Sequence, residues 1–183
     1  AVFFYAPMIF ERSGIGANAA FMQAALVGLV NLVFTVVAMA VIDRFGRRPL
    51  LVFGLSGIAA CMLLLAWAFG AGDDANPRLI LFAIIGFVAS FAVSLGPVMW
   101  VLFSELFPNR VRGVAISFVG LVNSATAFLV TLVFPWQLQS LGSATTFLLY
   151  GLFALAGLAF VIRVLPETKG RSLEELEAVL VRS

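Results

Sequence analysis

Histidine is absent from this 183-residue chain, cysteine occurs once, and charged residues make up only 11% of the sequence. Without histidine, the chain lacks the usual general base and the commonest metal ligand. The single cysteine, Cys61, has no partner within the chain, so a disulfide-stabilised scaffold is excluded. The charges form no basic stripe of the kind that binds nucleic acids. We therefore expect no metal site, no cofactor and no nucleic-acid partner.

The residues that are present are overwhelmingly apolar. Hydrophobic residues account for 63% of the chain, which includes 19 Phe, and the mean hydropathy is +1.13. An ordinary soluble domain carries about 25% charged residues, and a chain this apolar would leave large hydrophobic patches exposed to water. The composition therefore excludes a soluble globular domain and a disordered chain, and it predicts a membrane protein.

Charge-free stretches divide the chain into membrane-spanning segments, each of which needs about 20 mostly apolar residues. The first ten residues, AVFFYAPMIF, lack the positive region and the cleavage site of a signal peptide, so we expect the chain to start inside a membrane helix. We predict an all-α membrane protein with five full spans and the end of a sixth, followed by a tail over 166–183. The predicted spans are 1–10, 19–42, 50–69, 79–103, 114–134 and 145–165.

Basic residues are distributed unequally between the two ends of these spans. Arg12 and Arg78 lie in connections on one side, whereas the other nine of the 11 Lys and Arg residues lie on the opposite side. Because basic residues are retained on the cytoplasmic side of a membrane, we predict that the C-terminus is cytoplasmic.

The connection DRFGRRP over 43–49 is very short and densely charged. A carboxylate at the C-terminal end of a helix is disfavoured by the helix dipole, so Asp43 is expected to have a cationic partner. Gly46 in so tight a turn favours a specific geometry. The alternative is that the arginines here only anchor the helix ends at the membrane surface.

A second group of motifs comprises GPVMW over 96–100 and SELFPNRVRG over 104–113. Gly96 and Pro97 interrupt a predicted span, and such interruptions are tolerated where the backbone lines a cavity or is buried in protein. Helical periodicity predicts that Ser90, Ser94, Pro97 and Trp100 share one face of this helix. The alternative for Trp100 is an ordinary interfacial position near the end of the span.

The third motif, PETKGRSLEELE over 166–177, follows the last span. Ser172 and Glu175 have the spacing of a capping box. An apolar stripe follows, formed by Leu173, Leu176, Val179 and Leu180. We expect a short amphipathic helix at the cytoplasmic surface.

Together these three segments resemble the sugar porter family of the major facilitator superfamily, and AVFFYAP at the start resembles the outer half of its seventh helix. The resemblance implies the C-terminal half of that fold, in a multi-pass protein of the cell membrane. The N-terminal six-helix half and the start of the seventh helix are expected to be missing. The implied function is transport of a monosaccharide or polyol by alternating access, either facilitated or proton-coupled. No nucleophile–base pair is visible, so we predict that the chain is not an enzyme.

The resemblance also implies which residues bind the sugar. Asn31, Trp100 and Asn123 match sugar-contacting positions, and Tyr5, with Phe4, matches an aromatic gate. An amide both donates and accepts hydrogen bonds, which suits a polyol. The alternative for the two asparagines is a structural role in hydrogen bonding between helices.

In the family, charged residues at the cytoplasmic ends of the helices form a network that latches the two halves together. The matching residues here are Asp43, Arg47, Arg48, Glu105 and Arg112. Implied partners are the sugar, protons if transport is coupled, the lipid bilayer and the missing six-helix half. Two other functions are compatible with these residues: a membrane sugar sensor, and a partial chain that is inactive by itself.

Overall fold

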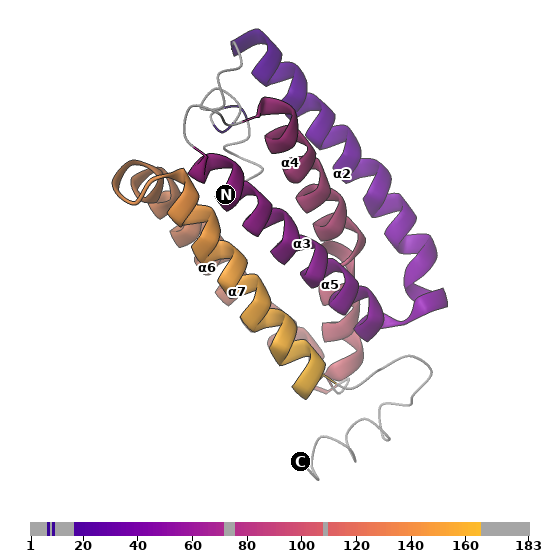
Figure 1. The fold of residues 1–183 in the computed structure, drawn as a ribbon. Helices are drawn as coiled ribbons and strands as arrows, with labels where there is room; N and C mark the ends of the chain where they lie inside the picture. The colour runs from indigo at the N-terminus through magenta and orange to yellow at the C-terminus, as the bar shows by residue number, and fades with distance from the viewer. Residues whose placement is uncertain (1–6, 8, 10–16, 72–75, 108–109, 166–183) are drawn as a thin grey trace.

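In a computed structural model of the protein, the residues described are Pro7, Ile9, 17–71, 76–107 and 110–165 (Figure 1). The predicted gate residues Phe4 and Tyr5, most of the 1–10 segment and the 166–183 tail lie outside them. The described part of the chain is α-helical. Its helices are α2 (Ala17–Phe45), α3 (Arg47–Gly70), α4 (Pro77–Val93), α5 (Leu95–Leu106), α6 (Arg112–Ser140) and α7 (Ser143–Val164).

Five helical segments are long and apolar enough to cross a membrane, and α4 and α5 together make one of them. This confirms the predicted all-α class with five full spans. Figure 1 shows α3 between α7 on one side and α4 with α5 on the other, while α2 packs against α4 and α6 lies beside α7. The central position of α3 makes it the helix around which the others are arranged.

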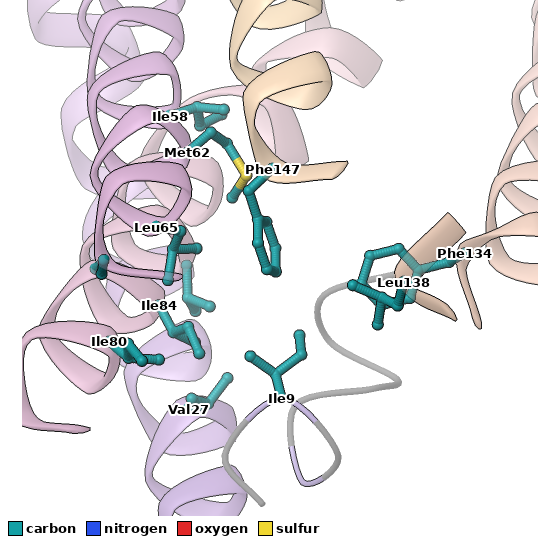
Figure 2. Packing of buried hydrophobic residues seen from close by; sticks show 13 residues of the cluster. Ile9, Val27, Ile58, Met62, Leu65, Ile80, Ile84, Phe134, Leu138 and Phe147 are labelled. Atoms are coloured by element: carbon teal, nitrogen blue, oxygen red, sulfur yellow. The ribbon is translucent and has the colours of Figure 1, made fainter. Parts of the chain in front are cut away.

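The larger core cluster lies where α3, α4 and α7 meet. Figure 2 shows Met62 and Leu65 of α3 packed near Ile84 of α4 and Phe147 of α7, with Ile9 close to the same cluster. The Phe147 ring stacks on Phe69 with the ring centroids 5.5 Å apart. Because lipid tails are as apolar as these side chains, close van der Waals packing holds such helices together rather than hydrophobic burial.

The interruption in the fourth span lies at Ser94 rather than at Gly96 and Pro97, where the sequence predicts it. Proline has no backbone N–H, so Pro97 cannot donate to the carbonyl of Val93, four residues earlier. The helical ladder is therefore lost one turn before the proline. Ser94, with φ −121° and ψ −89°, is the non-helical residue that joins α4 to α5.

The fifth span also differs from the prediction, which ends it at residue 134. Helix α6 continues through Pro135 to Ser140. Neighbouring helices and side chains can satisfy the backbone groups that a proline frees, so proline is tolerated within membrane helices. The predicted connection after this span is consequently much shorter in the structure, because α7 begins at Ser143.

Candidate functional site

A pocket of about 240 Å³ lies beside the interruption between α4 and α5, where these helices face α6. It is lined by Phe91, Leu95, Gly96, Met99, Trp100, Phe103 and Asn123. The pocket therefore brings together two of the predicted sugar-binding residues, Trp100 and Asn123, from helices that are separate in sequence. It also contains Gly96, the first residue of the predicted helix break.

The Trp100 indole forms a broad apolar plate in this pocket, and 46% of the residue is exposed. Phe103 supports it edge-on, with the ring centroids 6.3 Å apart and an interplanar angle of 87°. Helix α6 approaches the indole closely at Gly120, where a Cβ atom would lie 3.8 Å from Trp100 Cη2. An exposed plate held in this way suits stacking against the apolar face of a ring.

Asn31 lies on α2, half-buried, and it is not among the residues that line this pocket. Its Oδ1 accepts a hydrogen bond of 3.1 Å from the Thr35 hydroxyl, one turn later on the same helix. Asn123, by contrast, is exposed on α6. Within the described residues, the three predicted sugar-binding residues thus divide into a pair that shares the pocket and a third on a different helix.

The prediction that Ser90 and Ser94 share a face with Trp100 is wrong. Ser94 is fully buried, its hydroxyl donates to the Ser90 carbonyl at 2.6 Å, and it packs against Gly54 of α3. Ser90 packs against Gly57 of the same helix. In a regular helix Ser94 and Trp100, six positions apart, would already lie about 120° apart around the axis. In the structure the serines face α3 while Trp100 faces α6.

Phe91 is a pocket residue that the sequence reasoning missed. Phe91 and Trp100 are nine positions apart, which in a straight helix places them about 180° apart around the axis. The interruption at Ser94 turns both toward one pocket. The sequence does place Phe91 within two turns of the Gly96–Pro97 pair, and this closeness could have indicated that Phe91 lies near the interruption.

Arg47 and Glu105 form a two-point ion pair at the ends of α3 and α5. The Arg47 Nε lies 3.0 and 3.1 Å from the two Glu105 carboxylate oxygens, and its Nη2 lies 2.6 Å from Oε1. Asp43 joins them, with its Oδ1 3.1 Å from Arg47 Nη2, so the prediction that Asp43 has a cationic partner is confirmed. The Arg47 side chain is only 12% exposed, which shields the pair from solvent.

A one-residue connection makes this ion cluster possible. Gly46 alone separates α2 from α3, and its φ of 95° lies in the left-handed region that favours glycine. The tight reversal places Asp43, in the last turn of α2, next to Arg47 at the start of α3.

The other two predicted latch residues bind backbone carbonyls near helix ends. Arg48 Nη2 donates to the Ile162 carbonyl at 2.7 Å, in the last turn of α7. Arg112 Nε donates to the Phe107 carbonyl at 3.2 Å, just after α5 ends. The last carbonyls of a helix have no partner within the helix, so cations are favourable there.

Comparison with known proteins identifies the family. The family model described as "Sugar (and other) transporter" matches residues 1–180. The chain belongs to this family of sugar transporters. This confirms the resemblance to the sugar porters of the major facilitator superfamily, and it confirms that the chain is a membrane transporter segment and not an enzyme.

Curated relatives are similar along nearly the whole chain. It is 37% identical over 184 residues to the D-xylose-proton symporter of Escherichia coli strain K12, and 38% identical over 180 residues to the glucose transporter GlcP of Staphylococcus epidermidis. Each alignment covers 97% of this chain, which spans 37% and 40% of the length of these two relatives. The chain is therefore similar to one part of each transporter.

Solved structures agree with this. The xylose symporter XylE bound to 6-bromo-6-deoxy-D-glucose matches with a TM-score of 0.86 and 37% identity, covering 97% of this chain and 38% of that one. The inward-open form of XylE from E. coli matches with a TM-score of 0.79 and 34% identity, covering 97% of this chain and 41% of that one. The five membrane-length helices thus have the arrangement of part of the major facilitator fold.

Proposed function

We propose that this chain forms one wall of a sugar pathway and that, with a preceding six-helix half, it moves a monosaccharide or polyol by alternating access. The observation that carries the proposal is the pocket in which Trp100 and Asn123 meet beside the Ser94 interruption. An indole face and an amide are the groups that suit the apolar face and the hydroxyls of a sugar. The volume of about 240 Å³ is below the ~300–1,000 Å³ of complete small-molecule sites, as expected of one wall.

Polar side chains on α2 and α6 support the same proposal. Asn31 and Thr35 are on α2, and the exposed Asn123 and Thr126 are on α6. Polar groups within a membrane almost always face a bundle interior or a water-filled cavity, because hydrocarbon leaves them without partners. We assign these faces of α2 and α6 to the sugar pathway between the two halves, with Phe4 and Tyr5 as its outer gate.

We assign the five cytoplasmic charges to a latch on the inner side, with the C-terminus also inside. The Arg47–Glu105 pair ties α5 to the corner between α2 and α3. Arg48 and Arg112 bind carbonyls near the ends of α7 and α5. The cluster lies at the end of the bundle where basic residues concentrate, in agreement with the positive-inside rule.

Uptake of radiolabelled sugars by the full-length transporter containing this chain tests the proposal. Trp100→Ala should reduce uptake at least tenfold, since truncating a central aromatic anchor typically costs about 2 kcal/mol. Trp67→Ala is the matched control, because Trp67 is 68% exposed and lies outside the pocket. Equal uptake by the parent and Trp100→Ala, at equal membrane abundance, would refute the site. D-xylose, D-glucose and L-arabinose form the first panel, and this chain expressed alone should show no uptake.

A further inference from the structure

A second cavity, of about 500 Å³, lies between α3, α5 and α7, and we call it the apolar groove. Every residue that lines it is apolar, and α7 contributes Gly157, Phe160 and Val164 among them. This lining offers no charged side chain and no side-chain hydrogen-bond donor. A polar group placed there would lose its hydrogen bonds to water without replacement, so the groove suits a hydrocarbon.

The apolar groove and the pocket that holds Trp100 lie against each other along α5. They share three lining residues, Leu95, Met99 and Phe103, which follow one another at intervals of one helical turn. All three side chains are half-buried. Met99, the middle one, is unbranched and has three rotatable bonds, so it adapts its shape to its neighbours. The two cavities are therefore separated by side chains of α5 and not by a helix backbone.

The chemistry of the two cavities differs sharply. The Trp100 pocket presents an indole face and the Asn123 amide, which suit a sugar ring, whereas the groove presents only hydrocarbon and thioether surface. From Met99 to Phe107 the groove follows α5 for about 12 Å, since each helical residue rises 1.5 Å. An extended octyl chain fits this length, because each of its carbons advances by at most about 1.5 Å.

We propose that the apolar groove is an aglycone subsite, which binds the alkyl chain of a glycoside whose sugar ring lies in the Trp100 pocket. The subsite rests on the proposed function for the position of the ring. A free monosaccharide leaves the groove unused, and an alkyl glycoside fills both cavities. The glycoside therefore binds more tightly than the sugar and competes with it.

The first test measures how alkyl glycosides inhibit sugar uptake by the full-length transporter. The inhibitors are methyl, butyl and octyl D-glucopyranoside in both anomers, or the D-xylopyranosides if xylose is the better substrate, all at concentrations too low to form micelles. Between methyl and octyl, the inhibition constant of at least one anomer should fall about thirtyfold, which corresponds to burying about three methylene groups. Octyl tetraethylene glycol carries the same chain without a sugar, and it should not inhibit at these concentrations.

A substitution that fills the groove should remove the benefit of the chain. A Cβ atom at Gly157 would lie 3.7 Å from Leu55 Cδ2, an ordinary contact, so Gly157→Leu places its side chain in the groove without overlap at the Cβ atom. We expect the advantage of octyl over methyl to fall to about threefold or less, with inhibition by the methyl glycoside unchanged. Ala159→Leu is the matched control, because Ala159 is exposed on α7 and does not line the groove. If Gly157→Leu does not accumulate, Phe160→Ala replaces it, since losing this wall of the groove should also weaken octyl binding.

A second measurement does not depend on transport. Purified full-length transporter in lipid nanodiscs is irradiated with octyl D-glucopyranoside that carries a diazirine at the end of its chain. Peptide mapping should find the label on the segments that line the groove, 51–55 of α3 and 157–165 of α7. An excess of methyl D-glucopyranoside should displace the label, and Gly157→Leu should reduce it at least tenfold.

The outcomes separate the two proposals. Equal inhibition by the methyl and octyl compounds, or a gain with chain length that Gly157→Leu leaves intact, would overturn the aglycone subsite while sugar uptake continues. Label in the groove that excess methyl glycoside does not displace would indicate an independent site for a hydrocarbon chain, such as that of a lipid, and would also overturn it. Displaceable label in a transporter that moves no sugar would overturn the proposed function and leave the subsite standing.

Discussion

Helices α3 and α6 are both long enough to cross a membrane, yet they occupy very different surroundings. Helix α3 has nine buried residues distributed along its length. Helix α6 has two, Phe134 and Leu138, both near its C-terminal end. The difference concerns location in the fold rather than composition, because both helices qualify as membrane spans by length and hydropathy.

The contrast separates a helix that supports the bundle from a helix whose polar side chains are exposed. Helix α3 packs on α4 and α7 through small residues and large apolar side chains, whereas α6 leaves Asn123 and Thr126 exposed at mid-span. A side exposed in this way and bearing polar groups is suited to another protein surface or to a water-filled path. The packed side therefore stabilises the bundle, and the open side is the one on which we propose that sugar is bound.

We expect the largest effect from a substitution that disrupts the packing of α3 against α4. In Gly57→Leu the new side chain enters the contact with Ser90, where a Cβ atom alone would overlap the serine hydroxyl. Overpacking typically costs about 1–3 kcal/mol, and more where backbones are this close. We expect at least tenfold less monodisperse protein in size-exclusion chromatography. Gly113→Leu on α6 meets open space and should give the parental yield. An equal loss of monodisperse protein in both variants would show that α3 and α6 do not differ in how tightly they are packed.

Breaking the ion pair should have the next largest effect. Glu105→Gln removes one charge from a pair whose side chains are 12% and 27% exposed, while Arg47 keeps Asp43. A lost charge-assisted hydrogen bond corresponds to about 1.5 kcal/mol, a population shift of about tenfold. If the pair latches the inner side, its loss shifts the population toward the inward-open state. A cysteine that replaces the exposed Met22 should then react more slowly with a maleimide applied from outside. Arg110→Gln, at an exposed arginine, is the control. Faster outside labelling in Glu105→Gln contradicts the latch.

We expect substitutions of the polar residues on α6 and α2 to change sugar affinity moderately. Asn123→Ala removes an amide from the pocket and should raise KM about fivefold to tenfold, because one hydrogen bond contributes about 1 kcal/mol. Thr126→Val one turn later should leave KM unchanged, since the Thr126 hydroxyl already donates to the Val122 carbonyl at 2.8 Å. Asn31→Ala should raise KM less than Asn123→Ala does, since its Oδ1 is already bonded to Thr35. A larger effect of Thr126→Val than of Asn123→Ala would show that the amide is not the contact.

We expect the smallest effect from removing a hydrogen bond between α6 and α7. The Tyr150 hydroxyl donates to Gln137 Oε1 at 2.7 Å across these helices. Hydrogen bonds between membrane helices contribute about 0.6 kcal/mol on average, so Tyr150→Phe should lower the melting temperature in detergent only slightly. Gln137→Ala should do the same, and the double variant should add nothing further. A double variant much less stable than either single one would show that each residue has another role.

Charge spacing was sufficient to predict an all-α chain with five spans, and the helix-end position of Asp43 predicted its cationic partner. The prediction failed where the backbone departs from regular geometry. The missing N–H of Pro97 shifts the interruption to Ser94, and this in turn moves Phe91 into the pocket, while the serines pack against α3. The Arg47–Glu105 pairing joins residues 58 positions apart, and the family resemblance grouped these charges without assigning partners within this half.

The single-residue link at Gly46 has a consequence for how the chain enters a membrane. Since only this residue separates α2 from α3, the two helices have no slack with which to insert one after the other. We expect them to enter the membrane together as a hairpin, with the arginines of the connection retained on one side. The membrane topology of both helices is then decided in one step, and a longer tip inserted at Gly46 would uncouple them during biogenesis before it affected any later stage.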